Sequence, residues 1–149
     1  MEKISLKVSF KDSRGIITDL LSREKINAVT LITFRKGAAR GNHSHKKTTQ
    51  WNYLLSGKMK FFCRKSGGKL VILTAKKGDF IVARPNERHA LKALEKSELL
   101  VLTKGPRGGK EYESDTFRLS DPLVKQSKAG KKSPYEKEHP RFGAVLGPD

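Results

Sequence analysis

The feature that most constrains the fold is a series of short apolar runs, each ended by a turn signal. Ile4–Phe10 alternates apolar and polar residues, and Ala28–Phe34 is rich in β-branched residues. Both patterns are typical of strands. Ser56-Gly57 separates two further runs and predicts a hairpin. The remaining predicted strands are residues 16–18, 50–55, 58–64, 70–74, 80–83, 89–91 and 99–103.

Strands that recur every 8–12 residues or so are typical of an all-β sandwich or barrel. We expect a single helical turn, over Asp19–Lys25, and no long helix. The 149 residues suffice for one domain with its own core. We therefore predict a barrel over residues 1–119. Residues 120–149 have a linker-like composition and predict a polar basic tail, flexible or loosely docked, which Tyr135 and Phe142 could pin to the barrel.

The net charge of +17 is carried almost entirely by the predicted barrel. The tail holds six Lys or Arg and four acids, which leaves +15 on residues 1–119. Such a field attracts phosphorylated ligands and polyanions. The sequence shows no helix-turn-helix pattern and no aromatic stacking motif, so nucleic acid is not the expected partner.

Three further observations bear on the compartment. No apolar run approaches the roughly 18–20 residues that a membrane span needs. Met1–Ser5 contains no apolar stretch of a signal peptide. The single cysteine, Cys63, excludes an intramolecular disulfide and a cysteine-based zinc finger, and its position among apolar residues predicts a packed side chain. We expect a cytoplasmic protein.

A cluster of polar side chains carries the chemistry. His43 and His45 are two residues apart, so on a strand both project to one face. Gln50 and Asn52 share a parity in the same way, and His89 begins another predicted strand. Imidazoles on one face can share a metal ion or transfer protons. The sequence leaves both possibilities open.

These residues resemble the two motifs of the cupin superfamily. The first motif reads G-x5-H-x-H-x3–4-E-x6-G. Its matching residues here are Gly37, His43, His45 and Gly57, with Gln50 at the position of the Glu.

The second motif reads G-x5-P-x-G-x2-H-x3-N. Gly78 and His89 keep its glycine-to-histidine distance, Pro85 is displaced by one residue, Asn86 stands where Gly is usual, and Ala93 replaces the final Asn. The resemblance implies an all-β cupin fold, the double-stranded β-helix or jelly-roll barrel.

One branch of the superfamily is especially similar. The stretch Arg40–Lys46 followed by Gln50 resembles the R-G-x-H-A-H-K-x3-Q segment of dTDP-4-oxo-6-deoxyhexose 3,4-ketoisomerases, and residues 110–118 resemble a segment near their C-termini. The dTDP-4-dehydrorhamnose 3,5-epimerases belong to the same branch. These enzymes use no metal and move a proton beside a keto group of a nucleotide sugar.

The resemblance assigns roles to individual residues. His43 would be the catalytic base and His45 would assist it. Arg40 would neutralise a diphosphate or an enolate, and Gln50, Asn52 and His89 would complete the substrate site. The ketoisomerases carry tyrosines on the strand before the His-x-His segment, whereas residues 28–34 contain none. Tyr53, which has outward parity, and Tyr112 are not expected to replace them.

The alternative is a metal-dependent cupin. His43, His45 and His89, with Gln50 as a weak fourth ligand, would suit Zn, Fe, Ni or Mn. Such a protein could be a dioxygenase, a phosphosugar isomerase or a ligand-binding module without catalytic activity.

The strand that carries Gln50 also predicts an interface. If Gln50 and Asn52 face inward, Trp51, Tyr53 and Leu55 form an apolar outer face. We expect a homodimer through this face. The alternative is that the N-terminal strand or the C-terminal tail of the same chain covers it.

Overall fold

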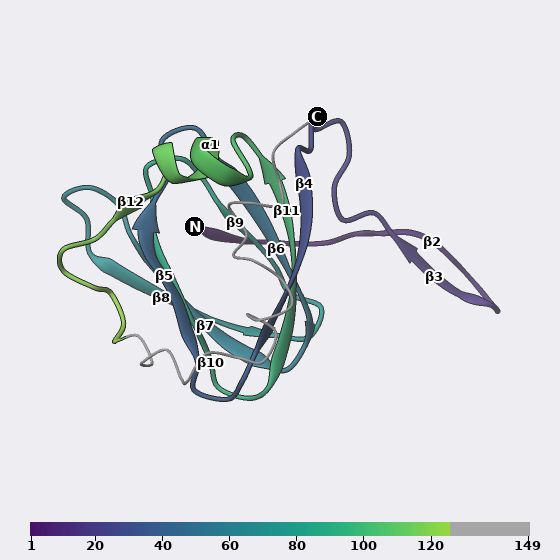
Figure 1. The fold of residues 1–149 in the computed structure, drawn as a ribbon. Helices are drawn as coiled ribbons and strands as arrows, with labels where there is room; N and C mark the ends of the chain where they lie inside the picture. The colour runs from purple at the N-terminus through teal and green to yellow at the C-terminus, as the bar shows by residue number, and fades with distance from the viewer. Residues whose placement is uncertain (126–149) are drawn as a thin grey trace, which may run out of the picture.

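The computed structural model describes residues 1–125, which form two five-stranded antiparallel sheets facing each other and a separate two-stranded hairpin (Figure 1). The β6 sheet has the order β1 (Glu2–Ile4), β9 (Phe80–Ala83), β6 (Thr49–Ser56), β11 (Ser97–Lys104) and β4 (Ala28–Phe34). The β10 sheet has the order β12 (Phe117–Arg118), β5 (Ala39–Ser44), β10 (Arg88–Ala93), β7 (Lys58–Arg64) and β8 (Leu70–Lys76). This is the predicted all-β jelly-roll barrel.

The hairpin consists of β2 (Val8–Asp12) and β3 (Gly15–Thr18), and projects from the barrel. The sequence predicted one strand over residues 4–10, but the chain leaves the β6 sheet after Ile4. The predicted helical turn at Asp19–Lys25 is also wrong, because Leu20 and Leu21 there pack against the β6 sheet in a non-helical conformation. The helix α1 (Gly109–Ser114) lies after the last long strand instead.

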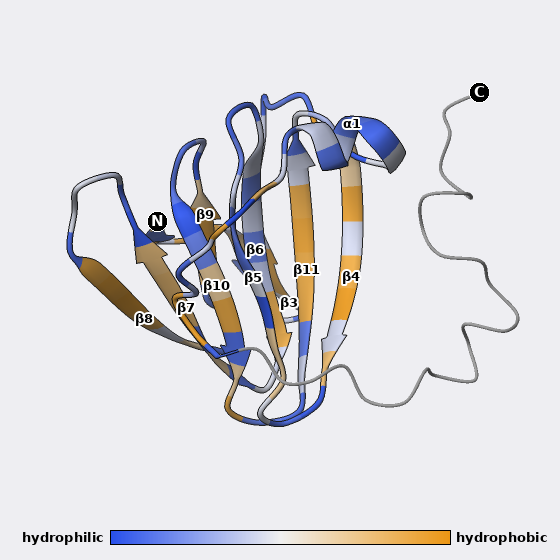
Figure 2. Ribbon diagram, turned by 60° about the vertical axis from the view of Figure 1, so that its left-hand side comes forward, coloured by the Kyte–Doolittle hydropathy of each residue, from blue (hydrophilic) through white to orange (hydrophobic). Residues whose placement is uncertain are grey.

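The space between the sheets changes from apolar at one end to polar at the other. Buried side chains of both sheets form the apolar core, with Phe34, Leu54, Met59, Phe61, Ile81 and Leu99 among them. In the pairing of β7 with β10, Met59 lies opposite Ala93, Phe61 opposite Leu91, and Cys63 opposite His89. Figure 2 shows the same contrast between strands, since β8 is mostly hydrophobic whereas β5 is largely hydrophilic. The polar end holds the histidines.

The outer face of β6 is covered by the chain's own N-terminal segment. Trp51 is buried together with Phe80 and Val82 of β9, and the residues packed on them include Leu6, Leu20, Leu21 and Ile26. The expectation that the Trp51, Tyr53 and Leu55 face is free for a second copy is therefore wrong at Trp51. Tyr53 and Leu55 are half-buried.

The first residues of the predicted tail are docked on the barrel. The N–H groups of Leu123 and Val124 donate to Oδ1 of Asn42, and its Nδ2 donates to the carbonyl of Val124. Tyr135 and Phe142 lie outside the described residues. Within residues 1–125, no helix is long and apolar enough to cross a membrane.

Gly57, the last glycine of the first cupin motif, provides a test of the hairpin between β6 and β7. Its φ is +87°, and a Cβ here would lie 2.8 Å from Cα of Ser97. We expect Gly57→Ala to lower the free energy of unfolding by about 3 kcal/mol, because left-handed strain adds to a backbone clash.

Gly67 is the matched control. Its φ is +68° and a Cβ would meet nothing within 4 Å, so Gly67→Ala should cost about 1 kcal/mol from strain alone. Urea denaturation of both variants measures the difference, and equal losses would contradict the close approach at Gly57.

Candidate functional site

A β-bulge aims His43 into the barrel. In the pairing of β5 with β10, His89 lies opposite His43 and Ala90 opposite Gly41, so Asn42 is the extra residue. Asn42 has a φ of 58°, which Asn tolerates better than most residues. Its side chain binds the 123–124 segment while His43 turns toward His89. Because of the bulge, Asn42 binds residues 123–124 while the adjacent His43 faces His89.

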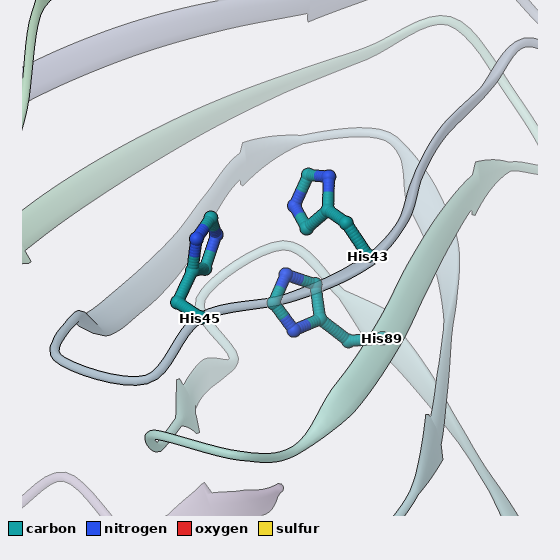
Figure 3. A group of neighbouring side chains, drawn as sticks. All are labelled: His43, His45 and His89. Atoms are coloured by element: carbon teal, nitrogen blue, oxygen red, sulfur yellow. The ribbon is translucent and has the colours of Figure 1, made fainter. Parts of the chain in front are cut away.

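The structure brings His43, His45 and His89 together, and their rings face one another (Figure 3). The ring centroids are 4.7 Å apart for His43 and His45, and 4.8 Å apart for His43 and His89. One nitrogen from each ring lies within 4.8 Å of the others. His45 and His89 are buried and His43 is half-buried, so His43 is the most accessible of the three.

Two of the rings have a fixed tautomer. Nδ1 of His45 lies 2.9 Å from the carbonyl oxygen of Asp115, and Nδ1 of His89 lies 3.0 Å from that of Glu87. A carbonyl can only accept, so each Nδ1 carries the proton, and in the neutral ring Nε2 keeps a free lone pair. Within residues 1–125, Nε2 of His45 is buried without a hydrogen-bond partner. The lone pair is available to a ligand.

Burial keeps these imidazoles neutral. Burial, together with the charges of His89, His45 and Arg118, lowers the pKa of His43 to about 3. Burial, the His45 charge and the amino group of Met1 lower the pKa of His89 to about 3 as well. The pKa of His45 is also lowered, because burial outweighs the opposing contacts with Asp115.

Asp115 holds the loop that follows His45. Its carboxylate accepts hydrogen bonds from the N–H groups of Lys46 and Lys47 and from the hydroxyl of Thr48 at 2.7 Å. Burial alone would raise the pKa of Asp115, but these hydrogen bonds lower it below its usual range. The sequence analysis did not single out Asp115, which lies 70 residues from His45 and has no local pattern to mark it.

A groove of about 620 Å³ runs over the free edge of β4 beside this site. Its lining comprises Thr30, Leu31, Ile32, Thr33, Arg40, Arg107, Gly108, Gly109, Lys110, Tyr112 and Glu113. The histidines do not line it. Tyr112 links the two, since its ring centroid lies 5.6 Å from that of His45. The guanidinium carbon (Cζ) of Arg107 lies 4.9 Å from the centroid of the Tyr112 ring, so a positive charge adjoins the phenol.

The other predicted site residues, Arg40, Asn52 and Gln50, differ in where they lie relative to the three histidines. Arg40 is exposed, lines the groove and lies 5.7 Å from the ring of Phe34. Asn52 is buried, and its Nδ2 donates to the carbonyls of Ile81 and Gln50, which gives this amide a structural contact. The side chain of Gln50 is half-buried on the opposite sheet from His43. Tyr112 is the residue that sequence reasoning undervalued.

Residues 30–103 match the cupin domain family. With the jelly-roll topology and the inward histidines, this match shows that residues 30–103 form a cupin domain, as the two motifs implied. Compared by sequence with curated proteins, the chain finds no match.

Several solved structures share the fold. The sugar 3,4-ketoisomerase QdtA from Thermoanaerobacterium thermosaccharolyticum, in complex with TDP, is 24% identical with a TM-score of 0.66, over 80% of this chain and 88% of QdtA. A double mutant of that enzyme with TDP is 26% identical with a TM-score of 0.65, over 79% and 86% of the chains. The dTDP-4-dehydrorhamnose 3,5-epimerase from Sulfolobus tokodaii is 16% identical with a TM-score of 0.63, over 78% and 75%.

The depressed pKa values predict that acid weakens the protein. A histidine with a pKa of about 3 in the folded state and 6.5 when unfolded stabilises the fold above pH 6.5, and that contribution is lost as the pH falls toward 3. Between pH 7.5 and pH 5, we expect His43 and His89 each to remove about 2 kcal/mol from the free energy of unfolding.

Urea denaturation across this pH range, with a chelator present, measures the loss. The variant His43→Asn should lose about 2 kcal/mol less than the parent over the same range. A parent protein whose stability is unchanged between pH 7.5 and pH 5 would contradict burial of neutral histidines.

Proposed function

We propose that the chain is an isomerase or epimerase that moves a proton at a carbon beside a keto group of a dTDP- or UDP-linked sugar. One observation carries the proposal: the His45–Tyr112 contact joins a group of neutral imidazoles to a groove edged with positive charge. The likeness to a ketoisomerase and to an epimerase supports it at the level of the fold.

The groove suits an anionic ligand of moderate size. Its volume lies within the range of roughly 300–1,000 Å³ typical of ligand sites. Arg40, Arg107 and Lys110 line it, and guanidinium groups match the oxygens of a diphosphate. A bound diphosphate would also raise the pKa of His43 from its low value, because a nearby negative charge favours the imidazolium.

In the proposed reaction, neutral His43 takes the proton from the carbon next to the ketone. The electron pair of the C–H bond moves to the keto oxygen and forms an enolate, which the positive edge of the groove stabilises. In an epimerase, a proton then returns to the same carbon. In an isomerase, the hydroxyl on that carbon gives its proton to the enolate oxygen and a proton is added to the former keto carbon, so the ketone and the hydroxyl exchange places. His45 assists His43, and the phenol of Tyr112, whose ring centroid lies 5.6 Å from that of His45, donates the returning proton.

Hydrogen–deuterium exchange tests this reaction directly. The protein is incubated in D₂O with a panel of dTDP-, UDP- and GDP-4-keto sugars, and NMR follows the protons beside the keto group. At least one sugar should exchange, and His43→Asn should slow the exchange by a factor of about 100 or more, the low end of a general base's contribution.

Two tyrosine variants separate the steps. Tyr112→Phe should keep the hydrogen–deuterium exchange, because His43 still removes the proton. It should slow product formation, because the phenol that returns a proton to the sugar is missing. Tyr53→Phe is the matched control, since Tyr53 packs near Phe80 on the other face of the β6 sheet. Absence of exchange with every sugar, or full activity of His43→Asn, would refute the proposal.

A second candidate function follows from the free lone pair on buried His45 Nε2. His43, His45 and His89 offer three neutral imidazole nitrogens within 4.8 Å of one another, and backbone carbonyls fix two of the rings. This donor set fits a divalent Zn, Fe, Ni or Mn ion, with Gln50 as a further ligand. Such an ion would act as a Lewis acid toward a bound substrate.

Metal content decides between the two candidates. Untagged protein is purified without chelator and measured by mass spectrometry beside His43→Ala/His45→Ala. The metal-free reaction predicts no stoichiometric metal and full exchange activity after chelation. Near-stoichiometric metal that the double variant lacks, together with loss of activity on chelation, would replace the first candidate by the second.

A further inference from the structure

A second pocket lies on the outer face of the β10 sheet, apart from the groove. Its volume is about 290 Å³, and it shares no lining residue with the groove. Arg64 and Arg88 line it. Arg88 comes directly before the buried His89 and Arg64 directly after the buried Cys63, so both arginines point to the side of the sheet away from the histidines. The β10 sheet therefore separates this pocket from the three rings.

Strand pairing places like charges directly opposite each other on this face. Arg88 of β10 pairs with Arg64 of β7, and four residues along the same strand Lys92 pairs with Lys60. Like charges at opposed positions destabilise a sheet. An anion held between two such side chains offsets their repulsion, and of the two pairs only the arginines border a pocket.

The acidic residues around the pocket leave this charge largely uncompensated. Within residues 1–125, Arg88 forms no ion pair, and Arg64 forms one, in which its Nη1 lies 4.0 Å from Oδ2 of Asp121. The Asp121 side chain is 90% exposed, so this ion pair is weak. Arg118 also lines the pocket, but its guanidinium is bound to Glu113. The two opposed guanidinium groups remain for a ligand.

We propose that this pocket binds a phosphate group, either as the free ion or as part of a phosphomonoester. Guanidinium groups match the oxygens of phosphate and can each donate two parallel hydrogen bonds. Ser44 and Ser120 also line the pocket, and serine hydroxyls can donate to the same oxygens. The volume is at the lower end of the range of roughly 300–1,000 Å³ typical of ligand sites, which suits a small anion. The proposal is independent of the reaction proposed for the groove.

A phosphate in this pocket also fastens the segment that supports His43. Arg64 and Arg88 belong to the sheet, whereas Ser120 and Leu123 belong to the segment after β12. The N–H of Leu123 donates to Oδ1 of Asn42, the residue before His43. A bound anion joins this segment to the sheet, so it should slow the opening of that hydrogen bond. A phosphorylated ligand can thus act on the histidine site from the opposite side of the sheet.

Titration of the full chain with inorganic phosphate at constant ionic strength, followed by the amide NMR signals, tests the site. The signals of Ser44, Ser120 and Leu123 should shift and saturate. Arg88→Gln should weaken binding about tenfold or more, the order expected for hydrogen bonds to a charged group. Arg88 is exposed and its loss removes a repulsion, so this variant should fold, which the dispersion of its NMR spectrum checks.

Lys92→Gln is the matched control, because it removes one charge from the same strand and the same face outside the pocket. Four strand residues place it about 13 Å from Arg88, beyond the Debye length of about 10 Å at 0.1 M salt. It should therefore change the dissociation constant less than about twofold. Asp121→Asn should tighten binding about threefold, because it removes the carboxylate that competes for Arg64.

Two further measurements complete the test. Phosphate should slow the amide hydrogen exchange of Leu123 in the parent and leave it unchanged in Arg88→Gln. A parallel titration with glycerol phosphate distinguishes the source of the phosphate group, since tighter binding than that of the free ion indicates a phosphomonoester and weaker binding indicates the ion itself.

Three outcomes would overturn the proposal. The first is the absence of any saturable shift with either probe. The second is equal weakening in Arg88→Gln and Lys92→Gln, which would show general attraction to a basic protein. The third is unchanged Leu123 exchange in the phosphate-saturated parent, which would remove the link between the pocket and the histidine site.

Discussion

Three imidazole rings can share the interior of this barrel only if no more than one of them carries a charge. Their centroids lie within 5.5 Å of one another, so two positive charges there would repel strongly at low dielectric. The fold maintains neutrality by burial, and two backbone carbonyls fix the tautomers of His45 and His89. The bulge at Asn42, which turns His43 toward His89, brings the rings within this distance.

Cationic side chains edge the groove beside the histidines. Arg40, Arg107 and Lys110 edge the groove, and Tyr112 lies between the groove and His45. The site therefore has a neutral interior that can accept a proton and a cationic rim that can bind an anion. An isomerase of anionic sugar derivatives needs both a group that accepts a proton and a surface that binds the anion.

The sequence predicted the elements that local patterns specify. Strand periodicity located most of the strands, and the period-two spacing of His43 and His45 with the later His89 identified the site's three rings. It included Asp115 and Tyr112 in the 110–118 stretch but gave Asp115 no role and dismissed Tyr112, because their contacts with residues about 70 positions away arise from tertiary packing.

The same limit applies to the outer face of β6. Alternation showed correctly that Trp51 points away from the core, but alternation says nothing about which segment covers it. Residues 19–25, with a composition compatible with a helical turn, instead place Leu20 and Leu21 on Trp51 in an irregular, non-helical path. Tertiary burial outweighed local propensity there.

One segment of the chain, residues 115–124, binds the backbone on both sides of His43 and His45. Asp115 ties the loop after His45, and Leu123 and Val124 bind Asn42, immediately before His43. The apolar core makes no such use of this segment, because its members all precede residue 102. We expect a cut between these two attachments to leave the apolar core intact while it frees the backbone around the histidines, so this segment would serve as a strap for the site rather than as part of the core.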